Sequence, residues 1–323
     1  MLDSILGSLK VVALATKTDF RSVTSREVAL FEGPMGWGEF SPFLEYSYEE
    51  SVPWLLSGIE AAFVESPREL RKLIEVNATL PAIDDPIEIE RLLEDFDGTK
   101  VIKIKVGGDL HVDLERIANV RRIRPESRIR IDVNGLWSVD QVELFLKEAG
   151  EIEYVEQPCS TIDELRELKL RTGITIAGDE IFRKAKDPLD IDIEGAVDIV
   201  MLKVAPLGGI AKALEIAKHY GVPVAVSSAL ESAVGISHGL RLAASLPELD
   251  YACGLGTGAL LAVDVAQLPI VDGVIEARDV TPNSEALTKF AVSNERLNWW
   301  KNRIRMTWGA GVQKAVAESG WKI

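Results

Sequence analysis

The stretch Val101-Ile102-Lys103-Ile104-Lys105 decides the fold, because a short β-branched run here ends on charged residues. Four later runs along the chain end in the same way, on Asp132, Glu156, Asp179 and Lys203. Successive ends are separated by about 25 residues, the length of one strand, one helix and their loops. Strands repeated in this way run parallel, so their charged ends gather at one edge. The pattern therefore predicts an α/β protein with a polar site at that edge.

Eight β-branched runs predict the strands of a closed barrel, and helical patterns fill the segments between them. Ser138 with Gln141, and Thr161 with Glu164, have the spacing of capping boxes at helix starts. Gly221 stands where a helix C-cap is expected. The predicted strands are Val76 to Leu80, Val101 to Val106, Ile129 to Val133, Ile152 to Val155, Ile174 to Ala177, Val197 to Leu202, Val222 to Val226 and Tyr251 to Gly254.

The start of the chain has a different pattern, in which strands pair through a tight turn. We predict an α+β domain over residues 1–80 and the barrel over residues 81–284. The tryptophan-rich tail, residues 285–323, is expected to return to the first domain. The predicted elements of that domain are strands at Lys10 to Ala15 and Ser25 to Phe31, a turn at Gly33-Pro34-Met35-Gly36 and a helix from Ser47 to Val64.

Composition excludes several classes of protein. The 323 residues are 47% hydrophobic and 27% charged, which is typical of a folded globular chain. The net charge of −15 argues against nucleic acid or anionic lipid as a partner. No apolar run is long enough to span a membrane, and the N-terminus lacks the basic leader of a signal peptide. Cys159 and Cys253 are widely separated, as expected of reduced thiols, so we predict a cytoplasmic protein.

The carboxylates of Asp132, Glu156 and Asp179 predict a metal site. Brought together at neighbouring strand ends, they would repel one another unless a cation lay between them. Oxygen ligands favour a hard ion, so we expect Mg²⁺, with Mn²⁺ as a substitute. Zinc would need histidine or cysteine, and the three histidines of the chain do not follow the charged strand ends.

The lysines at the strand ends are candidate bases. Lys103 and Lys105 are two residues apart on one strand, so both side chains point to the same face. Burial beside a cation makes loss of the ammonium proton easier. A base next to a hard metal suits removal of a proton α to a carboxylate, because the metal holds the enediolate that develops. We therefore expect a small-molecule carboxylate as the substrate.

These residues resemble the enolase superfamily, in its muconate-lactonizing-enzyme subgroup, over nearly the whole chain. The pairing of a lysine base with Mg²⁺ is an established feature of that superfamily. The resemblance implies a (β/α)7β-type barrel, with an N-terminal α+β capping domain that the C-terminal tail completes. It also implies that Lys105 is the base, that Lys103 and Lys203 stabilise the anionic intermediate, and that Asn134 and Glu180 support the metal ligands.

Within the subgroup, the chain is most similar to the o-succinylbenzoate synthases, which are dehydratases of menaquinone biosynthesis. The similarity lies in Ser227-Ser228-Ala229-Leu230-Glu231-Ser232 and in Cys253-Gly254-Leu255-Gly256-Thr257, which lacks an Asp-x-Asp pair. It implies substrate contacts at Ser227, Ser228, Gly254, Gly256 and Arg21. Helix capping by the serines and a turn role for the glycines are the structural alternatives.

Other functions stay open at this point. An N-succinylamino acid racemase and a muconate cycloisomerase share the same lysines and metal ligands. A Schiff-base aldolase would place a lysine as Lys203 is placed, but it would not need the three carboxylates. A barrel that has lost its chemistry would not keep every expected charged position. The sequence leaves the oligomeric state open.

Overall fold

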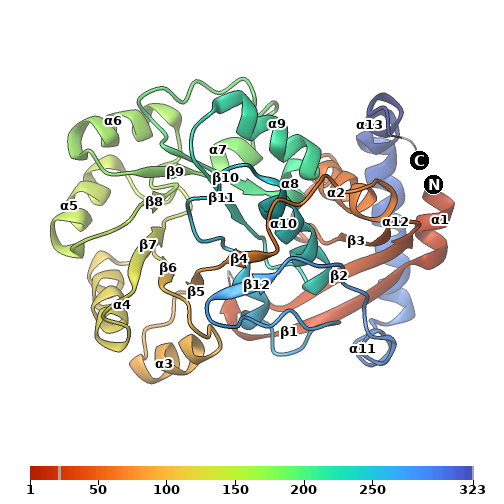
Figure 1. Ribbon diagram of the computed structural model, residues 1–323, viewed down its shortest axis with the longest axis horizontal. Coiled ribbons are helices and arrows are strands. Elements are labelled where there is room, and N and C mark those ends of the chain that lie inside the picture. Colours follow the sequence, from red (N-terminus) through yellow and green to blue (C-terminus); the bar gives the residue numbers. More distant parts are fainter. Residues whose placement is uncertain (21–22, 322–323) are drawn as a thin grey trace.

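The computed structural model describes residues 1–20 and 23–321. Its N-terminal residues form an antiparallel sheet in the order β1-β2-β3 (Figure 1). Gly33 pairs with Gly36 across the predicted turn, and φ of 136° at Gly36 lies in a region that favours glycine. The strands are β1 (Lys10–Phe20), β2 (Val23–Gly33) and β3 (Gly36–Phe40).

A parallel sheet of seven strands forms the centre of the molecule, in the order β11-β10-β9-β8-β7-β6-β5. Ile102 and Ile104 of β6 lie in the large apolar cluster that the helices cover, whereas Lys103 and Lys105 point to the opposite face. The strands are β5 (Ala78–Leu80), β6 (Val101–Lys105), β7 (Arg128–Asp132), β8 (Val155–Glu156), β9 (Ile176–Gly178), β10 (Ile199–Lys203) and β11 (Val224–Ser227).

The prediction of an eighth extended strand at Tyr251 to Gly254 is wrong. Only isolated parallel bridges form there, between Cys253 and Val76 and between Gly254 and Ser227. The Cys253 amide donates to the Glu75 carbonyl at 2.7 Å, and the Gly254 amide donates to the Val226 carbonyl at 2.8 Å. The chain then turns at once into a 3₁₀ helix, so no longer ladder develops. These residues therefore bond to β11 at one edge of the seven-stranded sheet and to the segment that precedes β5 at the other edge.

Helices lie between the strands and along the tail, and both predicted capping boxes, at Ser138 and Thr161, are confirmed. Gly221 ends its helix with φ of 60°, as predicted. The helices are α1 (Leu2–Ser8), α2 (Val52–Phe63), α3 (Pro86–Glu94), α4 (Leu110–Ile123), α5 (Val139–Ala149), α6 (Ile162–Thr172), α7 (Glu180–Arg183), α8 (Val204–Leu207), α9 (Ile210–Tyr220), α10 (Ala233–Ser245), η1 (Gly256–Leu260), α11 (Ser284–Lys289), α12 (Asn294–Thr307), η2 (Trp308–Val312) and α13 (Gln313–Glu318).

The C-terminal tail packs on the N-terminal sheet (Figure 1). Trp300 of α12 is fully buried, meets the Phe40 ring edge-on at 5.8 Å and donates from Nε1 to Glu27 at 2.6 Å. Arg303 donates to the Phe43 carbonyl at 3.0 Å. A short pairing of β4 (Leu73–Glu75) with β12 (Val274–Glu276) lies between the two sheets in Figure 1.

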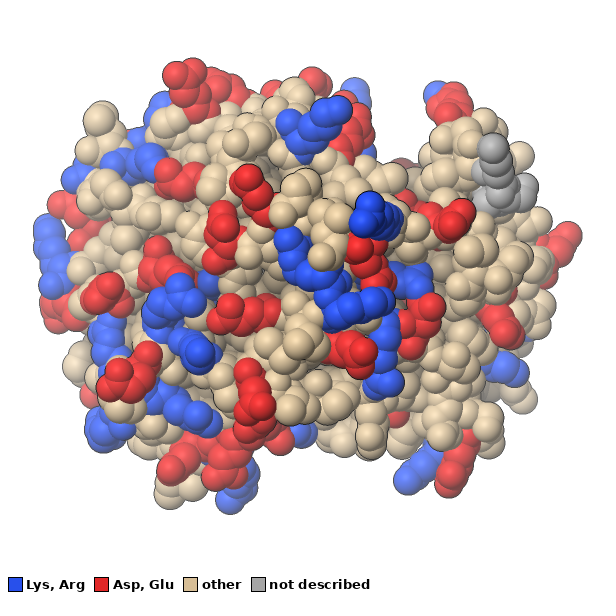
Figure 2. All heavy atoms as spheres, viewed as in Figure 1, with Lys and Arg blue, Asp and Glu red and all other residues tan. Residues whose placement is uncertain are grey.

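The outer surface is polar and mixed in charge. Acidic and basic side chains are interspersed over the face that Figure 2 shows. Within the described part of the chain, no helix is both long and apolar enough to cross a bilayer. Cys159 and Cys253 are buried free thiols.

Candidate active site

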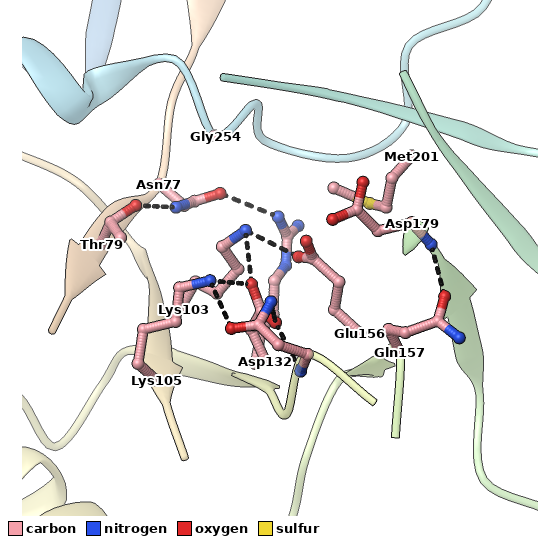
Figure 3. A network of polar contacts seen from close by, with 12 residues as sticks. Asn77, Thr79, Lys103, Lys105, Asp132, Glu156, Gln157, Asp179, Met201 and Gly254 are labelled. Carbon is pink, nitrogen blue, oxygen red and sulfur yellow. Dashed lines mark hydrogen bonds and ion pairs between the residues drawn. The ribbon is translucent and has the colours of Figure 1, made fainter. Parts of the chain in front are cut away.

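Six charged side chains come together at the carboxyl ends of neighbouring strands, and we call them the strand-end cluster. Figure 3 shows four of them, Lys103, Lys105, Asp132 and Glu156, pointing toward one another. Their side chains are buried, with exposed fractions from 0% for Asp132 and Glu156 to 12% for Lys105. The cluster consists of Lys103 and Lys105 on β6, Asp132 on β7, Glu156 on β8, Asp179 after β9 and Lys203 on β10.

Each carboxylate of the strand-end cluster is paired with a lysine. Lys103 Nζ lies 2.6 Å from Glu156 Oε2 and 3.5 Å from Asp132 Oδ2, while Lys105 Nζ donates to Asp132. Lys203 Nζ donates to Asp179 Oδ2 at 2.6 Å. The charges are therefore balanced across adjacent strands, which offsets much of the cost of their burial.

These pairs change the pKa of Lys103. Burial alone would lower it, but the Glu156 and Asp132 carboxylates outweigh burial and raise the pKa. The two carboxylates therefore favour the ammonium form of Lys103.

Asn134 and Glu180 lie next to the carboxylates, as the resemblance implied. Asn134 Nδ2 donates to Asp132 Oδ1 at 2.7 Å and to Glu180 Oε1 at 3.3 Å. Burial and the neighbouring Asp179 carboxylate raise the pKa of Glu180. Asn134 has φ of 55°, a left-handed conformation that asparagine tolerates better than most residues. These contacts fix the orientation of the Asp132 carboxylate.

Two residues near Asp179, Arg183 and Tyr46, were missed by the sequence reasoning, whereas the resemblance had placed Gln157 beside the carboxylates. Arg183 Nε lies 3.2 Å from both Asp179 oxygens, and its Nη1 donates to the Tyr46 hydroxyl at 3.1 Å. Gln157 Oε1 accepts a hydrogen bond from the Asp179 amide at 3.0 Å. The backbone of Gln157 is left-handed, with φ of 40°. Burial raises the pKa of Asp179, but Lys203 and Arg183 outweigh it and lower the pKa. The four-residue step from Asp179 to Arg183 was a usable signal, since i and i+4 face each other on a helix.

The donor set of the cluster fits a hard cation. Glu156 Oε1 is buried and accepts no hydrogen bond from the described residues, and it lies 3.7 Å from Lys203 Nζ. An oxygen with a free lone pair beside two further carboxylates is suited to Mg²⁺. Within residues 1–20 and 23–321, no group of three His, Cys, Asp or Glu side chains is arranged to hold a metal ion as the side chains stand, and the three carboxylates of the cluster face lysines.

The predicted substrate contacts divide into three groups. Ser227 and Ser228 line a cavity over the lysines, and Ser228 Oγ donates to the Gly254 carbonyl at 2.8 Å. Gly254 permits close packing, since a Cβ there would lie 2.5 Å from Ser227 Oγ. Gly256 is packed against the Asn77 carbonyl, and neither glycine lines this cavity. Arg21 lies outside the described residues.

Aromatic and aliphatic side chains line the cavity together with the lysines. Phe43, Tyr46 and Trp54 line it from the N-terminal part of the chain, and Leu230 lines it from the loop after β11. Thr79 contributes a hydroxyl at the end of β5. The cavity therefore offers ammonium groups for a carboxylate and aromatic faces for a ring.

Comparison with known proteins agrees with this geometry. Residues 88–282 match the family described as enolase C-terminal domain-like, and residues 11–62 match the one described as enolase N-terminal domain-like. An o-succinylbenzoate synthase of Mycobacterium ulcerans is 47% identical over 311 residues, covering 94% of each chain. One from Mycobacterium leprae is 46% identical over 327 residues, covering 99% of this chain and 97% of that one.

Solved structures share the fold at low identity. Muconate lactonizing enzyme from Pseudomonas putida has a TM-score of 0.73 at 20% identity, covering 88% of this chain and 98% of that one. N-succinyl Arg/Lys racemase from Bacillus cereus has a TM-score of 0.72 at 20% identity, with 88% and 97% covered. With the strand-end cluster and the identity over nearly the full length, the chain belongs to the enolase superfamily, in the family of the o-succinylbenzoate synthases.

Proposed function

We propose that this chain is a Mg²⁺-dependent o-succinylbenzoate synthase, a carbon–oxygen lyase of menaquinone biosynthesis. It dehydrates 2-succinyl-6-hydroxy-2,4-cyclohexadiene-1-carboxylate. The observation that carries the proposal is the convergence of Lys105, Lys203 and three carboxylates at neighbouring strand ends. Relatives of that name, 45% to 47% identical, support the choice of substrate.

Lys105 is the proposed base. In its neutral form, Nζ accepts the proton on the carbon α to the substrate carboxylate, leaving an enediolate. Lys103 and Lys203 lie beside the same carboxylates and stabilise the negative charge that develops on the substrate oxygens. The enediolate then expels hydroxide from the neighbouring ring carbon. Protonated Lys105 returns its proton to that hydroxide on the same face, so water leaves and the ring becomes aromatic.

Asp132, Glu156 and Asp179 are the proposed ligands of Mg²⁺. The bound ion supplies Lewis-acid stabilisation of the carboxylate oxygens in the enediolate. The free lone pair on buried Glu156 Oε1 and the all-oxygen donor set support this assignment. Asn134 and Gln157 hold the Asp132 carboxylate and the Asp179 backbone in place through their side-chain amides.

We also propose that the central sheet is a closed (β/α)7β barrel. The hydrogen bonds of Cys253 and Gly254 to Glu75 and Val226 support closure. The proposed domains are the barrel over residues 81–284 and a capping domain over residues 1–80, to which residues 285–323 return. The family matches over residues 11–62 and 88–282 and the packing of α12 on the N-terminal sheet support this division.

A small-molecule carboxylate is the proposed partner, with no nucleic acid or membrane. The net charge of −15 supports the exclusion of nucleic acid. Two buried free thiols support a reducing, cytoplasmic compartment.

The test is the ultraviolet signal for conversion of the cyclohexadiene carboxylate, with Mg²⁺ and with a chelator, for wild type and Lys105→Ala. We expect turnover that requires Mg²⁺ and falls on the order of 10²–10⁴-fold in the variant. Lys169→Ala is the matched control, since Lys169 is paired with Asp198 outside the strand-end cluster. Turnover that persists in chelator, or in Lys105→Ala, would refute the proposal.

A racemase of N-succinylamino acids is the second candidate. Lys105 and Lys203 stand on β6 and β10, with three strands between them in the sheet, so they approach a substrate from different sides. Racemisation needs a base on each face of the α carbon. Deuterium washing into both enantiomers of an N-succinylamino acid would establish this activity, and exchange into neither would exclude it.

A further inference from the structure

A buried ion pair on α4 contacts the backbone at Lys105 and lies outside the strand-end cluster. Asp113 and Arg116 are 2% and 3% exposed, and Arg116 Nη1 donates to Asp113 Oδ1. Removing two charges from water is costly, so such a pair is retained only where its other hydrogen bonds are satisfied. The partners of those bonds therefore indicate what the pair holds in place.

The partners are backbone groups at the end of β6. Arg116 Nη1 donates to the Lys105 carbonyl at 2.8 Å. Asp113 Oδ2 accepts from the Gly107 amide at 2.9 Å and from the Gly108 amide at 3.0 Å. One ion pair thus binds the peptide of Lys105 and the turn that follows it.

The remaining donors of Arg116 extend the contact to the segment after β5. Arg116 Nε donates to the Ile83 carbonyl at 3.1 Å and to Asp84 Oδ1 at 2.9 Å. The guanidinium fork therefore ties the end of β6 to the neighbouring loop. A lysine could not reproduce these contacts, because its ammonium lacks the planar fork.

The turn after Lys105 leaves little room for adjustment. Gly107 has φ of 124°, and a Cβ there would lie 2.9 Å from Leu136 Cδ1 and 3.2 Å from the Val133 carbonyl. The Val106 amide donates to the Asp132 carbonyl at 3.1 Å. The Lys105 backbone is thus held from the β7 side by the sheet and from the helix side by the ion pair.

We propose that Arg116 and Asp113 are positioning residues for Lys105. By fixing its carbonyl and the following turn, they set where Lys105 Nζ meets the substrate. The inference rests on the proposed role of Lys105 as base. Neither residue lines the cavity over the lysines, so their loss should lower kcat and leave KM nearly unchanged.

The test compares Arg116→Gln, Arg116→Lys and Asp113→Asn with Arg124→Gln. Arg124 is the C-cap of α4. Like Arg116 it donates to a backbone carbonyl, that of Leu93 at 3.0 Å, but it does not contact Lys105. We expect kcat to fall on the order of 10²-fold in the first three variants with KM within about threefold, since an ångström of misplacement costs about that much. Arg124→Gln should keep kcat within about twofold.

Crystal structures of the folded variants separate this inference from the proposed function. A shift of Lys105 Nζ by about 1 Å in Arg116→Gln supports positioning even where the wild type fails to turn over the cyclohexadiene carboxylate. An unmoved Lys105, or a loss of kcat no greater than in Arg124→Gln at the same folded fraction, would overturn it. Should Arg116→Gln not fold, Asp113→Asn decides by the same criteria.

Discussion

Two groups of buried charges in the molecule are built differently. In the strand-end cluster every carboxylate faces a lysine. In the second group, which we call the hairpin cluster, Glu39 and Glu231 both feel the charge of the Arg26 guanidinium, whose hydrogen bonds go to backbone carbonyls. Ser41 and Ser232 complete the hairpin cluster through their hydroxyls. One group balances charge with charge, and the other relies on hydrogen bonds.

The hairpin cluster joins β3 to the loop after β11. Glu39 accepts from the Ser41 and Ser232 hydroxyls, both at 2.5 Å, and from the Gly235 amide at 3.0 Å. Arg26 Nε donates to the Leu230 carbonyl at 3.2 Å. Leu230 has φ of 63°, so these contacts hold a strained backbone that lines the cavity.

Charge balance decides the protonation of the two groups. In the strand-end cluster Lys203 and Arg183 lower the pKa of Asp179 against the effect of burial. In the hairpin cluster burial and the Glu39 carboxylate raise the pKa of Glu231 to about 7. The charged form is therefore favoured at Asp179, and the neutral acid is favoured at Glu231.

The largest loss of activity should come from Glu156→Gln in the strand-end cluster. The amide keeps the size of the side chain but removes a proposed metal ligand and the partner of Lys103. Loss of several kcal/mol of transition-state stabilisation corresponds to a fall in kcat/KM on the order of 10³-fold. Steady-state turnover with Mg²⁺ in excess measures this. Activity within tenfold of wild type would remove Glu156 from the proposed site.

Glu231→Gln tests the unbalanced charge of the hairpin cluster through pH. A carboxyl whose pKa is raised from 4.5 to about 7 on folding stabilises the fold below pH 4.5, and this contribution is lost as the pH rises through 7. The wild type should therefore lose up to about 3 kcal/mol of unfolding free energy from this group by pH 8. The variant should match the wild type near pH 4.5 and exceed it at pH 8.

Urea unfolding at pH 4.5, 6 and 8 measures the effect of Glu231. The wild type and the variant share the other titrating groups, including Asp264, whose pKa burial also raises to about 7. Their difference therefore isolates Glu231. Two parallel curves of stability against pH would show that Glu231 keeps an ordinary pKa in the folded protein.

The matched substitution in the hairpin cluster is Glu39→Gln. The new amide group faces the Ser41 and Ser232 hydroxyls and the Gly235 amide, where only an acceptor fits. Disturbing hydrogen bonds to a buried charged group should cost about 2 kcal/mol of unfolding free energy. Activity measured on folded protein should stay within about tenfold, since Glu39 is not among the residues lining the cavity over the lysines. A loss of activity as large as that of Glu156→Gln would show that the hairpin cluster takes part in the chemistry as the strand-end cluster is proposed to do.

The strand-end cluster was predictable because each βα unit contributes one charged residue at its strand end. The hairpin cluster was not predictable from sequence, since Glu39 and Ser232 are 193 residues apart and no local pattern links them. Arg183 and Tyr46 also meet only in the folded chain, across 137 residues. Strand bounds in the central sheet shifted by up to three residues, at the start of β8, and β1 ends five residues later than predicted, because β-branched runs indicate burial rather than ladder hydrogen bonds.

The smallest effect is expected at Thr161, which belongs to neither cluster. Its hydroxyl accepts from the Glu164 amide at 3.3 Å and caps α6 at the surface. Thr161→Ala should therefore cost about 1 kcal/mol of unfolding free energy and leave kcat and KM unchanged. Urea unfolding and turnover on one preparation measure both. Because this loss approaches that of Glu39→Gln, the pair shows whether a change of activity follows the place of a substitution or merely the stability that it removes.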